Sequence, residues 1–451
     1  MRRLLVLLVL LGSLPAGANI FDIYGFNPRG ISLGSAMVSE VDDYTATFYN
    51  PAALTRHKHI TLGGGFTFSI PRLTVGRSVP VCLNGRAACN AAHGTRWTDR
   101  ESALPGHFSG LTLGWDIPFG GLLQNKLAFG LALYLPTINI VRAEGLDPQT
   151  PQFYMYQNLP DEIVILASLA YRPWEWMSLG IGVQVLANVF GSAKFGLDPA
   201  NGLISKQDFT VALVPKVAAT AGLLFFPMPN LRIGLSYRQA LSLEFGLPAD
   251  FMIGDVVGLG LEVAGNVLYT PHQISIGLGY TFEKQHLTIS AQADIALWSQ
   301  APDPSPHVSV DFKGKLLDAF GLQNAVDVSV NAPQLELKFR DIVIPRIGIE
   351  WGPLEWLMVR AGYFWRPSPV PYATGPSNYL DNDVHSVAFG AAFTFKDPLG
   401  VNQNPIRIEI GNSFGIMPRR TVKKQNADDP IGDLEHSGFT YALSVSVNYS
   451  Y

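Results

Sequence analysis

Apolar and polar residues alternate along most of this chain. From His59 to the last residue, about fourteen stretches show the period of two that is typical of β-strands with two different faces. We place these strands near 59–70, 107–118, 126–136, 162–173, 177–190, 208–227, 230–246, 267–282, 286–299, 334–352, 355–367, 384–396, 404–416 and 437–451. After the N-terminus, no apolar run is long and uninterrupted enough for a membrane-spanning helix, so the pattern predicts an all-β protein.

The connections between these strands alternate in length. Short ones such as 173–177 and 282–286 follow long ones such as 137–161 and 247–266. Short turns on one side and long loops on the other are typical of outer-membrane barrels, whose strands must close on themselves because hydrocarbon cannot pair backbone polar groups. We therefore predict a 14-stranded antiparallel transmembrane β-barrel in the cell outer membrane, with both termini in the periplasm.

The last predicted strand separates its two faces most clearly. One face is apolar and ends in aromatic residues, as a lipid-facing row does: Phe439, Tyr441, Leu443, Val445, Val447, Tyr449 and Tyr451. The residues between them are small or polar and suit a crowded lumen. A C-terminal aromatic residue on such a strand also resembles the signal read by the bacterial barrel-assembly machinery. The alternative, a soluble β-sandwich edge, would expose this row to water and invite aggregation.

The amino-acid composition argues against one class of function, nucleic-acid binding. Hydrophobic residues make up 47% of the chain and charged residues 15%, and the formal net charge is −4 without a basic stripe, which argues against nucleic acid as a partner. The first eighteen residues predict a signal peptide, with Arg2 and Arg3 before the apolar core Leu4–Leu11. The alternative of an anchor helix requires a longer apolar core.

The only two cysteines, Cys82 and Cys89, lie in one polar connection. In an exported protein such a pair predicts a small disulfide loop. A metal site is not predicted, because His93 is the only further ligand nearby. Catalytic motifs are also missing: the sequence has no Gly-x-Ser-x-Gly elbow, no His-Glu-x-x-His and no phosphate-binding glycine loop. We predict neither an enzyme nor a bound cofactor.

The segment 19–56 has no strand-length periodicity. It is rich in glycine, alanine and small polar residues, and it ends on a turn formed by Asn50, Pro51 and Ala52. A small segment that packs poorly on itself, followed by a long alternating region, suggests a plug, or hatch, inside a barrel. The predicted organisation is a signal peptide (1–18), a hatch (19–56) and a barrel (57–451).

Strand parity also places charged residues inside the barrel. On 230–246 and 355–367 the apolar row faces lipid, so Arg232, Arg238, Arg360 and Arg366 face inward. The same rule places further charges inside: Asp294, Glu336, Lys338, Arg340, Arg346, Glu350, Arg407 and Glu409. These charges either form a structural network with the hatch or, beside apolar surface, bind the carboxylate of an amphiphile.

Several motifs resemble the FadL family of outer-membrane long-chain fatty-acid transporters. In the hatch these are Leu33-Gly-x-Ala, the pair Asp42-Asp43 and Tyr49-Asn-Pro-Ala. In the barrel they are Trp298-Ser, Phe339-Arg-Asp followed by Pro-Arg-Ile-Gly, Arg360-Ala-Gly-Tyr followed by Ser-Pro-Val-Pro, and Leu380-Asp-Asn-Asp-Val-His. The chain departs from the family pattern in the cysteine-bearing connection 71–106 and in the modest apolar content of 137–161.

The resemblance implies a mechanism. A hatch of about 40 residues plugs the barrel, and substrate passes from an outer apolar groove to an interior pocket and then sideways into the bilayer. Asn50, Pro51 and Ala52 match the hatch motif. Arg340 matches a position near the bound carboxylate, and Lys194 is a second candidate by the same comparison. Together with strand parity, the substrate-binding candidates are Arg340, Lys194, Arg346, Arg360 and Arg232.

We therefore expect a monomeric transporter that takes up long-chain fatty acids or related hydrophobic molecules by facilitated diffusion. Its partners are the hydrophobic ligand, outer-membrane lipid or detergent, and the assembly machinery. Three alternatives stay open: uptake of aromatic hydrocarbons by the same route, a permanently plugged structural or adhesive barrel, and a general porin.

Overall fold

A computed structural model gives the fold. It describes residues 20–77, 107–138, 151–156, 163–198, 203–253, 257–302, 307–313, 327–330, 337–375, 377–396, 404–426 and 432–451. The predicted signal peptide and both cysteines lie outside these residues. Within the described ranges, no helix is long and apolar enough to cross a membrane.

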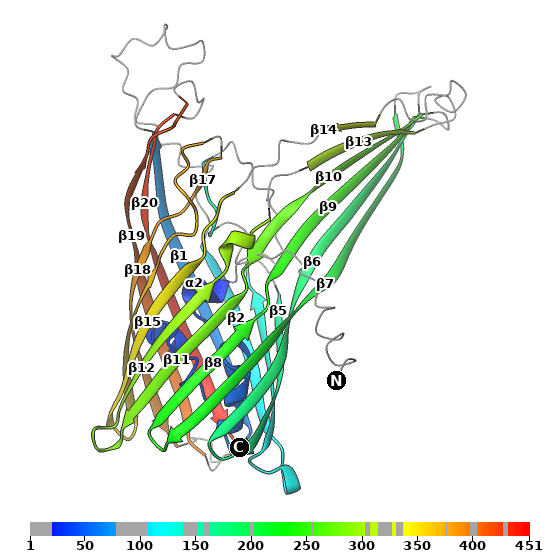
Figure 1. Cartoon of the computed structure of the whole chain (residues 1–451). Coiled ribbons are helices and arrows are strands. Elements are labelled where there is room, and N and C mark those ends of the chain that lie inside the picture. The colour runs from blue at the N-terminus through cyan, green and yellow to red at the C-terminus, as the bar shows by residue number, and fades with distance from the viewer. Residues whose placement is uncertain are drawn as a thin grey trace, which may run out of the picture.

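Fourteen strands form one closed antiparallel barrel (Figure 1). In order around the wall they are β1 (Thr61–Arg77), β2 (Phe108–Pro118), β3 (Leu127–Pro136), β5 (Val164–Trp174), β6 (Met177–Asp198), β7 (Leu203–Met228), β8 (Leu231–Arg238), β11 (Gln273–Phe282), β12 (Leu287–Ala296), β15 (Ile342–Leu354), β16 (Leu357–Arg366), β18 (Val384–Phe395), β19 (Ile406–Val422) and β20 (Leu434–Ser450). β20 closes the barrel on β1, from Thr61 opposite Ser450 to Arg77 opposite Leu434. The predicted strand number is confirmed.

The two faces of the wall follow the predicted alternation. Apolar residues on the outside are exposed along the strands, for example Ile181 at 66% and Phe389 at 51%, while residues of the other parity, such as Ala388, are buried. Tryptophans gather near the short turns between β5 and β6 and between β15 and β16: Trp174, Trp176, Trp351 and Trp356. This arrangement is that of an outer-membrane barrel with an interfacial aromatic belt.

The turns at the lower end are short, as predicted, and some contain a single 3-10 turn: η3 (Gly121–Leu123) between β2 and β3, and η4 (Glu283–Gln285) between β11 and β12. The C-terminus lies at this same end (Figure 1). At the other end, η5 (Trp298–Gln300) follows β12.

Some strand limits differ from the prediction. The expected strands 230–246 and 267–282 each break, because β8 ends at Arg238 and β11 begins only at Gln273. Pro271, which has no N–H to donate to the ladder, lies at the second break. Pro215 and Pro345 also lack an N–H to donate, yet both pair in continuous register, opposite Ala187 and Ala293.

Parts of the predicted long loops are also strands. β8 and β11 pair in the wall, and beyond it β9 (Leu241–Ile253) and β10 (Val257–Thr270) pair with each other and continue the same hairpin. β13 (His307–Lys313) and β14 (Asp327–Val330) are added next to β10. β6 and β7 run on beyond the wall, and β9 pairs in parallel with the end of β6. Figure 1 shows this sheet leaning away from the barrel mouth. Separately, β4 (Gln152–Phe153) pairs in parallel with β17 (Tyr379–Leu380).

The N-terminal segment, residues 20–56, folds inside the barrel (Figure 1). It contains α2 (Ile20–Tyr24), α3 (Pro28–Ser32), α4 (Ala46–Tyr49) and the 3-10 helix η1 (Pro51–Arg56). Asn27 and Asn50 are the N-cap residues of α3 and η1 and cap them in the same way. Each side-chain oxygen accepts a backbone N–H, from Gly30 at 2.8 Å and from Ala52 at 3.2 Å, and a proline follows at the first helical position.

Inward-facing glycines of the wall make room for this segment. Among the described residues, eleven of the fourteen strands carry a glycine whose added Cβ would meet the N-terminal segment. At Gly180 it would lie 2.2 Å from the amide nitrogen of Ala52, and at Gly222 2.0 Å from Oδ1 of Asn50. Contacts under 3.0 Å do not occur for real Cβ atoms. The wall and the segment are therefore fitted to one another around nearly the whole circumference.

Candidate functional site

The turn motif at Asn50 ties the N-terminal segment together and to the wall. Its side-chain amide donates to the carbonyl oxygen of Val38 at 2.8 Å and to that of Leu223 on β7 at 3.1 Å. Asn50 and Ala52 are fully buried. An Asn at this position thus satisfies backbone groups in both parts of the molecule, which an apolar side chain of the same size cannot do.

Predicted inward arginines bind carboxylates of the segment or of the wall. Arg232 on β8 makes a bidentate ion pair with Glu40, with its Nη2 2.8 Å from Oε2 and its Nε 3.0 Å from Oε1. Both side chains are buried. A bidentate guanidinium–carboxylate pair holds the two side chains in one relative orientation and neutralises both charges. Removal of one buried partner leaves the other as a buried charge without a counter-charge.

A second charge network joins the segment to β15, β16 and β19. Glu350 accepts from Arg29 of the segment at 3.0 Å and from Arg360 of the wall at 2.6 Å. Arg360 also donates to Glu409 at 3.0 Å, and Arg407 pairs with the same carboxylate. Cations and carboxylates alternate through this network, so the lumen side of the wall is neutralised locally.

Asp42 belongs to the same network, because it pairs with Arg29. Burial alone would raise the pKa of the Asp42 carboxyl, but Arg29 and Arg56 outweigh burial and hold it well below its ordinary value. The carboxylate therefore stays charged at neutral and mildly acidic pH. Arg56 further donates to the carbonyl oxygen of Val41 at 2.8 Å, which secures the chain next to Asp42.

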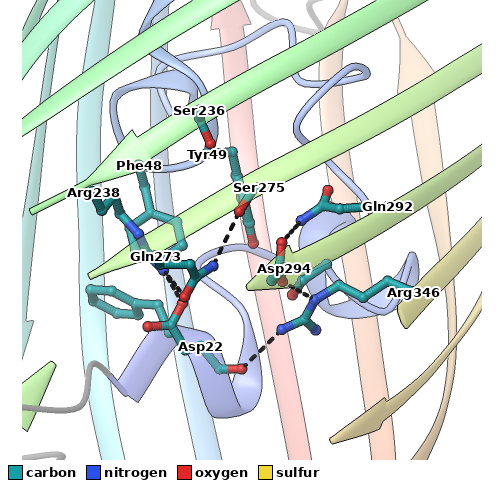
Figure 2. A pocket seen from close by; sticks show the side chains of 12 residues that line it. Asp22, Phe48, Tyr49, Ser236, Arg238, Gln273, Ser275, Gln292, Asp294 and Arg346 are labelled. Carbon is teal, nitrogen blue, oxygen red and sulfur yellow. Dashed lines mark hydrogen bonds and ion pairs between the residues drawn. The ribbon is translucent and has the colours of Figure 1, made fainter. Parts of the chain in front are cut away.

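The upper side of the segment meets β8, β11, β12 and β15 through a third network (Figure 2). Arg346 donates to Asp294 at 2.5 Å and to the carbonyl oxygen of Gly34 at 3.0 Å. Arg238 pairs with Asp22 and donates to Gln273 at 2.8 Å. The cavity enclosed by these groups measures about 20 Å³, which is room for a water molecule and not for an acyl chain.

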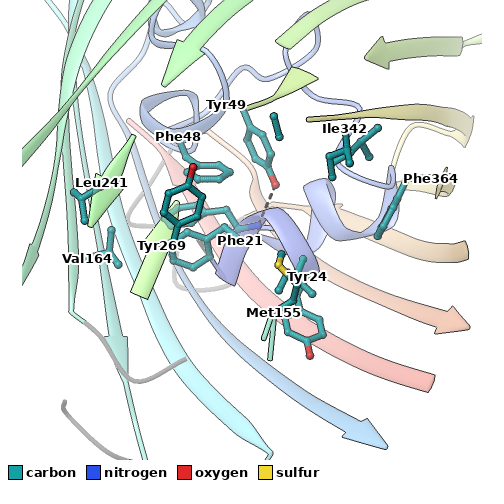
Figure 3. Packing of buried hydrophobic residues seen from close by; sticks show 14 of the residues in the cluster. Phe21, Tyr24, Phe48, Tyr49, Met155, Val164, Leu241, Tyr269, Ile342 and Phe364 are labelled. Carbon is teal, nitrogen blue, oxygen red and sulfur yellow. Dashed lines mark hydrogen bonds between the residues drawn. The ribbon is translucent and has the colours of Figure 1, made fainter. Parts of the chain in front are cut away.

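Aromatic residues of the segment line the same cavity as the polar groups. They pack on one another in a cluster of buried residues (Figure 3). Phe21 packs edge-to-face on Phe26 at 4.5 Å, on Phe48 at 5.4 Å and on Tyr134 of β3 at 5.0 Å between ring centroids. The guanidinium of Arg238 lies 4.3 Å from the centroid of the Phe48 ring. Further apolar residues of the wall and connections join the same cluster: Val164, Leu241, Tyr269 and Met155.

In the same cluster, five buried aromatic residues bring together connections that are far apart in the sequence. We call this group the aromatic cap; its members are Tyr154, Tyr269, Trp298, Phe339 and Tyr379. Tyr154 is central, with its ring 4.9 Å from that of Phe339 and 5.6 Å from that of Tyr379. An apolar layer thus continues from the N-terminal segment to the connections at the barrel mouth.

The remaining predicted site residues lie near or beyond this cap. Arg340 is exposed, directly follows Phe339, and donates from Nε to the carbonyl oxygen of Ser368 at 3.0 Å. Lys194 lies on the part of β6 that extends beyond the wall, where its backbone pairs with Asp208 and Asp250. The candidates therefore do not converge: Arg232, Arg346 and Arg360 lie in the lumen around the segment, and the other two do not.

Sequence reasoning missed the pairing of Asp22 with Arg238. Strand parity placed Arg238 inside, and Asp22 lay within the predicted hatch, but 216 residues separate them. The aromatic cap was also missed. A signal for it existed, because Trp298 and Phe339 belong to motifs noted above, and both lie within three residues of the end of a wall strand.

Comparison with known proteins agrees with this architecture. No protein-family model matches the chain. The chain is 23% identical to alkane uptake protein A of Marinobacter nauticus over 465 residues, covering 97% of this chain and 93% of that protein. Among solved structures, it is similar to a Pseudomonas aeruginosa FadL homologue (15% identity, TM-score 0.58, 97% of this chain and 98% of that one). It is also similar to the Pseudomonas putida toluene transporter TodX (16% identity, TM-score 0.56, 95% and 99%).

Fold and site together define an outer-membrane β-barrel whose lumen contains its own N-terminal segment. The full-length structural matches show that the chain has the fold of the FadL homologue and of TodX. The fold that the resemblance of the sequence motifs implied is thereby confirmed.

Proposed function

We propose that this protein takes up hydrophobic molecules across the outer membrane by facilitated diffusion, with residues 20–56 as its plug. The observation that carries the proposal is the continuous apolar layer from the aromatic cap to Phe21 and Phe48 of the N-terminal segment, inside a barrel of FadL fold. The names of its relatives, an alkane uptake protein and a toluene transporter, agree with such a cargo. Transport, and not catalysis, is the activity that this arrangement suits.

An apolar route suits these molecules energetically. Each methylene gains about 0.8 kcal/mol on leaving water, so a water-filled pore would oppose the passage of a long chain. In the described residues, neighbouring strands pair all around the wall. Sideways exit into the bilayer therefore requires a local opening of the wall or a movement of the plug. Movement down a concentration gradient needs no other energy source.

The charges favour neutral cargo. Six inward arginines of the wall each have a carboxylate partner among the described residues: Arg232, Arg238, Arg346, Arg360, Arg366 and Arg407. A cargo carboxylate would have to displace one of these partners, whereas an alkane or an aromatic hydrocarbon need not. We therefore propose hydrocarbons as the first substrate class.

Long-chain fatty acids are the second class, because one cation is suitably placed for a carboxylate. Arg340 is exposed beside the aromatic cap, and its Nε hydrogen bond goes to a neutral carbonyl oxygen. If Arg340 holds a fatty-acid headgroup, Arg340→Ala weakens oleate binding measured by calorimetry and leaves hexadecane uptake unchanged. Unchanged oleate affinity would remove Arg340 from the site.

The fold supports a proposal for the arrangement of the protein in the cell. We propose that the short turns and both chain ends lie on the periplasmic side and that the mature chain begins after the predicted signal peptide. We further propose that the protein works as a monomer and is inserted by the barrel-assembly machinery. The test of the central function is uptake of labelled hexadecane and oleate by liposomes that contain the purified protein, compared with empty liposomes.

A further inference from the structure

One buried carboxyl group of the wall differs from the others. Asp116 lies two residues before the lower end of β2, is 0% exposed, and has no hydrogen-bond partner for either side-chain oxygen among the described residues. By contrast, Asp294, Glu350 and Glu409 of the wall each pair with an arginine. Asp116 therefore lacks the counter-charge that these three carboxylates have.

Strand parity and register determine what lies beside Asp116 in the wall. Its neighbours along β2, Trp115 and Ile117, are exposed on the outside of the barrel, so Asp116 points inward. The residue opposite it on β1 is Thr61, and the residue opposite it on β3 is Gly130. Neither neighbouring strand therefore places a charge directly beside the Asp116 carboxyl group.

The plug packs against the wall on both sides of Asp116. A Cβ added at Gly114, the preceding inward residue of β2, would lie 2.0 Å from the ring of Tyr44. A Cβ added at Gly130 would lie 2.6 Å from the side chain of Leu54. Because the plug fits this closely here, the Asp116 carboxyl group is kept out of water as long as the plug is in place.

The charged groups that act on Asp116 are two carboxyl groups of the plug. They are Asp43 and, with a smaller effect, Asp42, and no cation of the described residues is among them. Asp42 pairs with Arg29. The titratable side chain of Tyr44 stays neutral, because burial raises the pKa of its hydroxyl group. The plug therefore offers an ionised Asp116 repulsion and no compensation.

An ionised Asp116 would be a buried charge without a partner, which is strongly unfavourable. A metal ion or a proton could neutralise it. Among the described residues, no group of three histidine, cysteine or acidic side chains could hold a metal ion. A proton needs no further ligand, and a neutral carboxyl group tolerates both burial and the neighbouring carboxylates.

A polar cavity near this site provides a route for the proton. The cavity measures about 150 Å³ and is lined by Asp43 and Thr61 together with Tyr449 and Ser450, near the C-terminal end of the chain. This is room for several water molecules. Because Thr61 is opposite Asp116, movement of the turn at Asp43 would bring this water to the Asp116 carboxyl group.

We propose that Asp116 binds a proton while the plug is in place and releases it when the plug leaves this part of the wall. The hydrated carboxyl group then ionises, as an ordinary aspartate does at neutral pH. The proton bound in the plugged state stabilises that state fully at low pH, and this contribution is lost as pH rises. Displacement of the plug is therefore favoured by rising pH, by at most about tenfold in its equilibrium constant per pH unit.

The proposal adds a regulation to the proposed function and rests on it only where plug movement is linked to the passage of cargo. The test needs no cargo and uses the full-length protein in nanodiscs. Asp116→Asn keeps the shape of a neutral carboxyl group and cannot ionise. The matched control is Glu435→Gln, which removes a carboxylate that pairs with the exposed Arg419 and is itself 34% exposed.

The first measurement is amide hydrogen exchange of residues 42–49 between pH 6 and pH 9, corrected for the intrinsic pH dependence of exchange. In the wild type and in Glu435→Gln, protection should fall by about tenfold or more over this range. In Asp116→Asn it should change by less than about twofold, because no proton is then exchanged at this site. An equal fall in protection of the wild type and Asp116→Asn would overturn the proposal.

The second measurement detects the proton directly and does not depend on the stability of the plug. At neutral pH, the infrared spectrum of the wild type should contain the C=O stretching band of a protonated carboxyl group that Asp116→Asn lacks. Identical spectra in this region would overturn the proposal. So would protection that rises on addition of Ca²⁺ at constant pH in the wild type and not in Asp116→Asn, because the site would then bind a metal ion. Lack of hydrocarbon uptake by a wild type that shows both expected results would contradict only the proposed function.

Discussion

Asp22 of the N-terminal segment and Arg238 of β8 form an ion pair, and the guanidinium of Arg238 lies over the ring of Phe48. Arg238 of the wall thus contacts both a carboxylate of the N-terminal segment, Asp22, and an aromatic ring of the same segment, Phe48. Gln273 accepts a further hydrogen bond from Arg238 at 2.8 Å. Any movement of α2 that opens a path past Phe21 must break or stretch this pair.

Removing the cation of this pair should loosen the plug. Arg238→Met leaves the carboxylate of Asp22 largely buried without its partner, which costs about 3–5 kcal/mol for a buried pair. We expect steady ion conductance of the variant in planar bilayers, where the wild type conducts little. The double variant with Asp22→Asn should conduct less than Arg238→Met alone, since no buried charge then remains unpaired. Equal conductance of the two variants would show that the pair does not hold the plug.

The contribution of the buried pair Arg232–Glu40 to the stability of the segment can be compared with that of an exposed Arg–Glu pair. Arg232→Ala should speed amide hydrogen exchange in residues 36–41 on the order of 100-fold, the equivalent of about 3 kcal/mol. The control is Arg419→Ala, since Arg419 pairs with Glu435 at 3.3 Å but is 64% exposed. Exposed pairs contribute about 0–1 kcal/mol, so exchange should change little. The account is wrong if both substitutions have the same small effect.

The plug should also be displaced by a single methyl group. In Gly180→Ala the new Cβ would lie 2.2 Å from the amide nitrogen of Ala52, so η1 has to shift or the strand has to bend. We expect a drop in stability of about 1–3 kcal/mol, as for other overpacked sites, and faster proteolysis within residues 50–56. Gly120→Ala is the control, because nothing lies within 4 Å of its added Cβ. Resistance to protease equal to that of the wild type would show that the segment does not need this close fit.

Two carboxylates of the plug should respond to pH with opposite signs. Burial raises the pKa of Asp22 more than Arg238 lowers it, so this group contributes to the stability of the folded state at low pH and loses that contribution as pH rises above its ordinary value of 3.8. The pKa of Asp42 is depressed despite burial, because Arg29 and Arg56 outweigh it. Its contribution is present above pH 3.8 and is lost as pH falls toward the lowered value.

The measurement compares wild type with Asp22→Asn and with Asp42→Asn by denaturant unfolding between pH 3 and pH 8. Relative to wild type, Asp22→Asn should gain stability as pH rises from about 3.8, and Asp42→Asn should be least stable in the neutral range. Parallel pH profiles of all three proteins would contradict the assigned environments.

Strand parity alone was sufficient to predict the barrel. The same two-residue alternation that places Ile181 and Phe389 in lipid also places Arg232, Arg346 and Arg360 inside, because a membrane wall allows little exception to it. The partners of these arginines were not predictable. Arg346 donates to the carbonyl oxygen of Gly34, which is 312 residues away in the sequence. No local sequence pattern predicts such a contact.

The strands beyond the wall show where the sequence pattern failed. Residues 191–207 and 247–266 were expected to be connections, whereas much of both is strand, in β6, β7, β9 and β10. The pairing of β6 with β9 then depends on contacts between hairpins and cannot be inferred from either hairpin alone.

The most direct test of the central claim measures hydrocarbon uptake and ion conductance on the same preparation. Liposomes with the purified protein should take up labelled hexadecane faster than empty liposomes, while planar bilayers with the same protein show no steady open-pore conductance. Uptake at the rate of empty liposomes, or uptake that occurs only together with a permanent conductance, would contradict a plugged barrel that carries hydrophobic molecules.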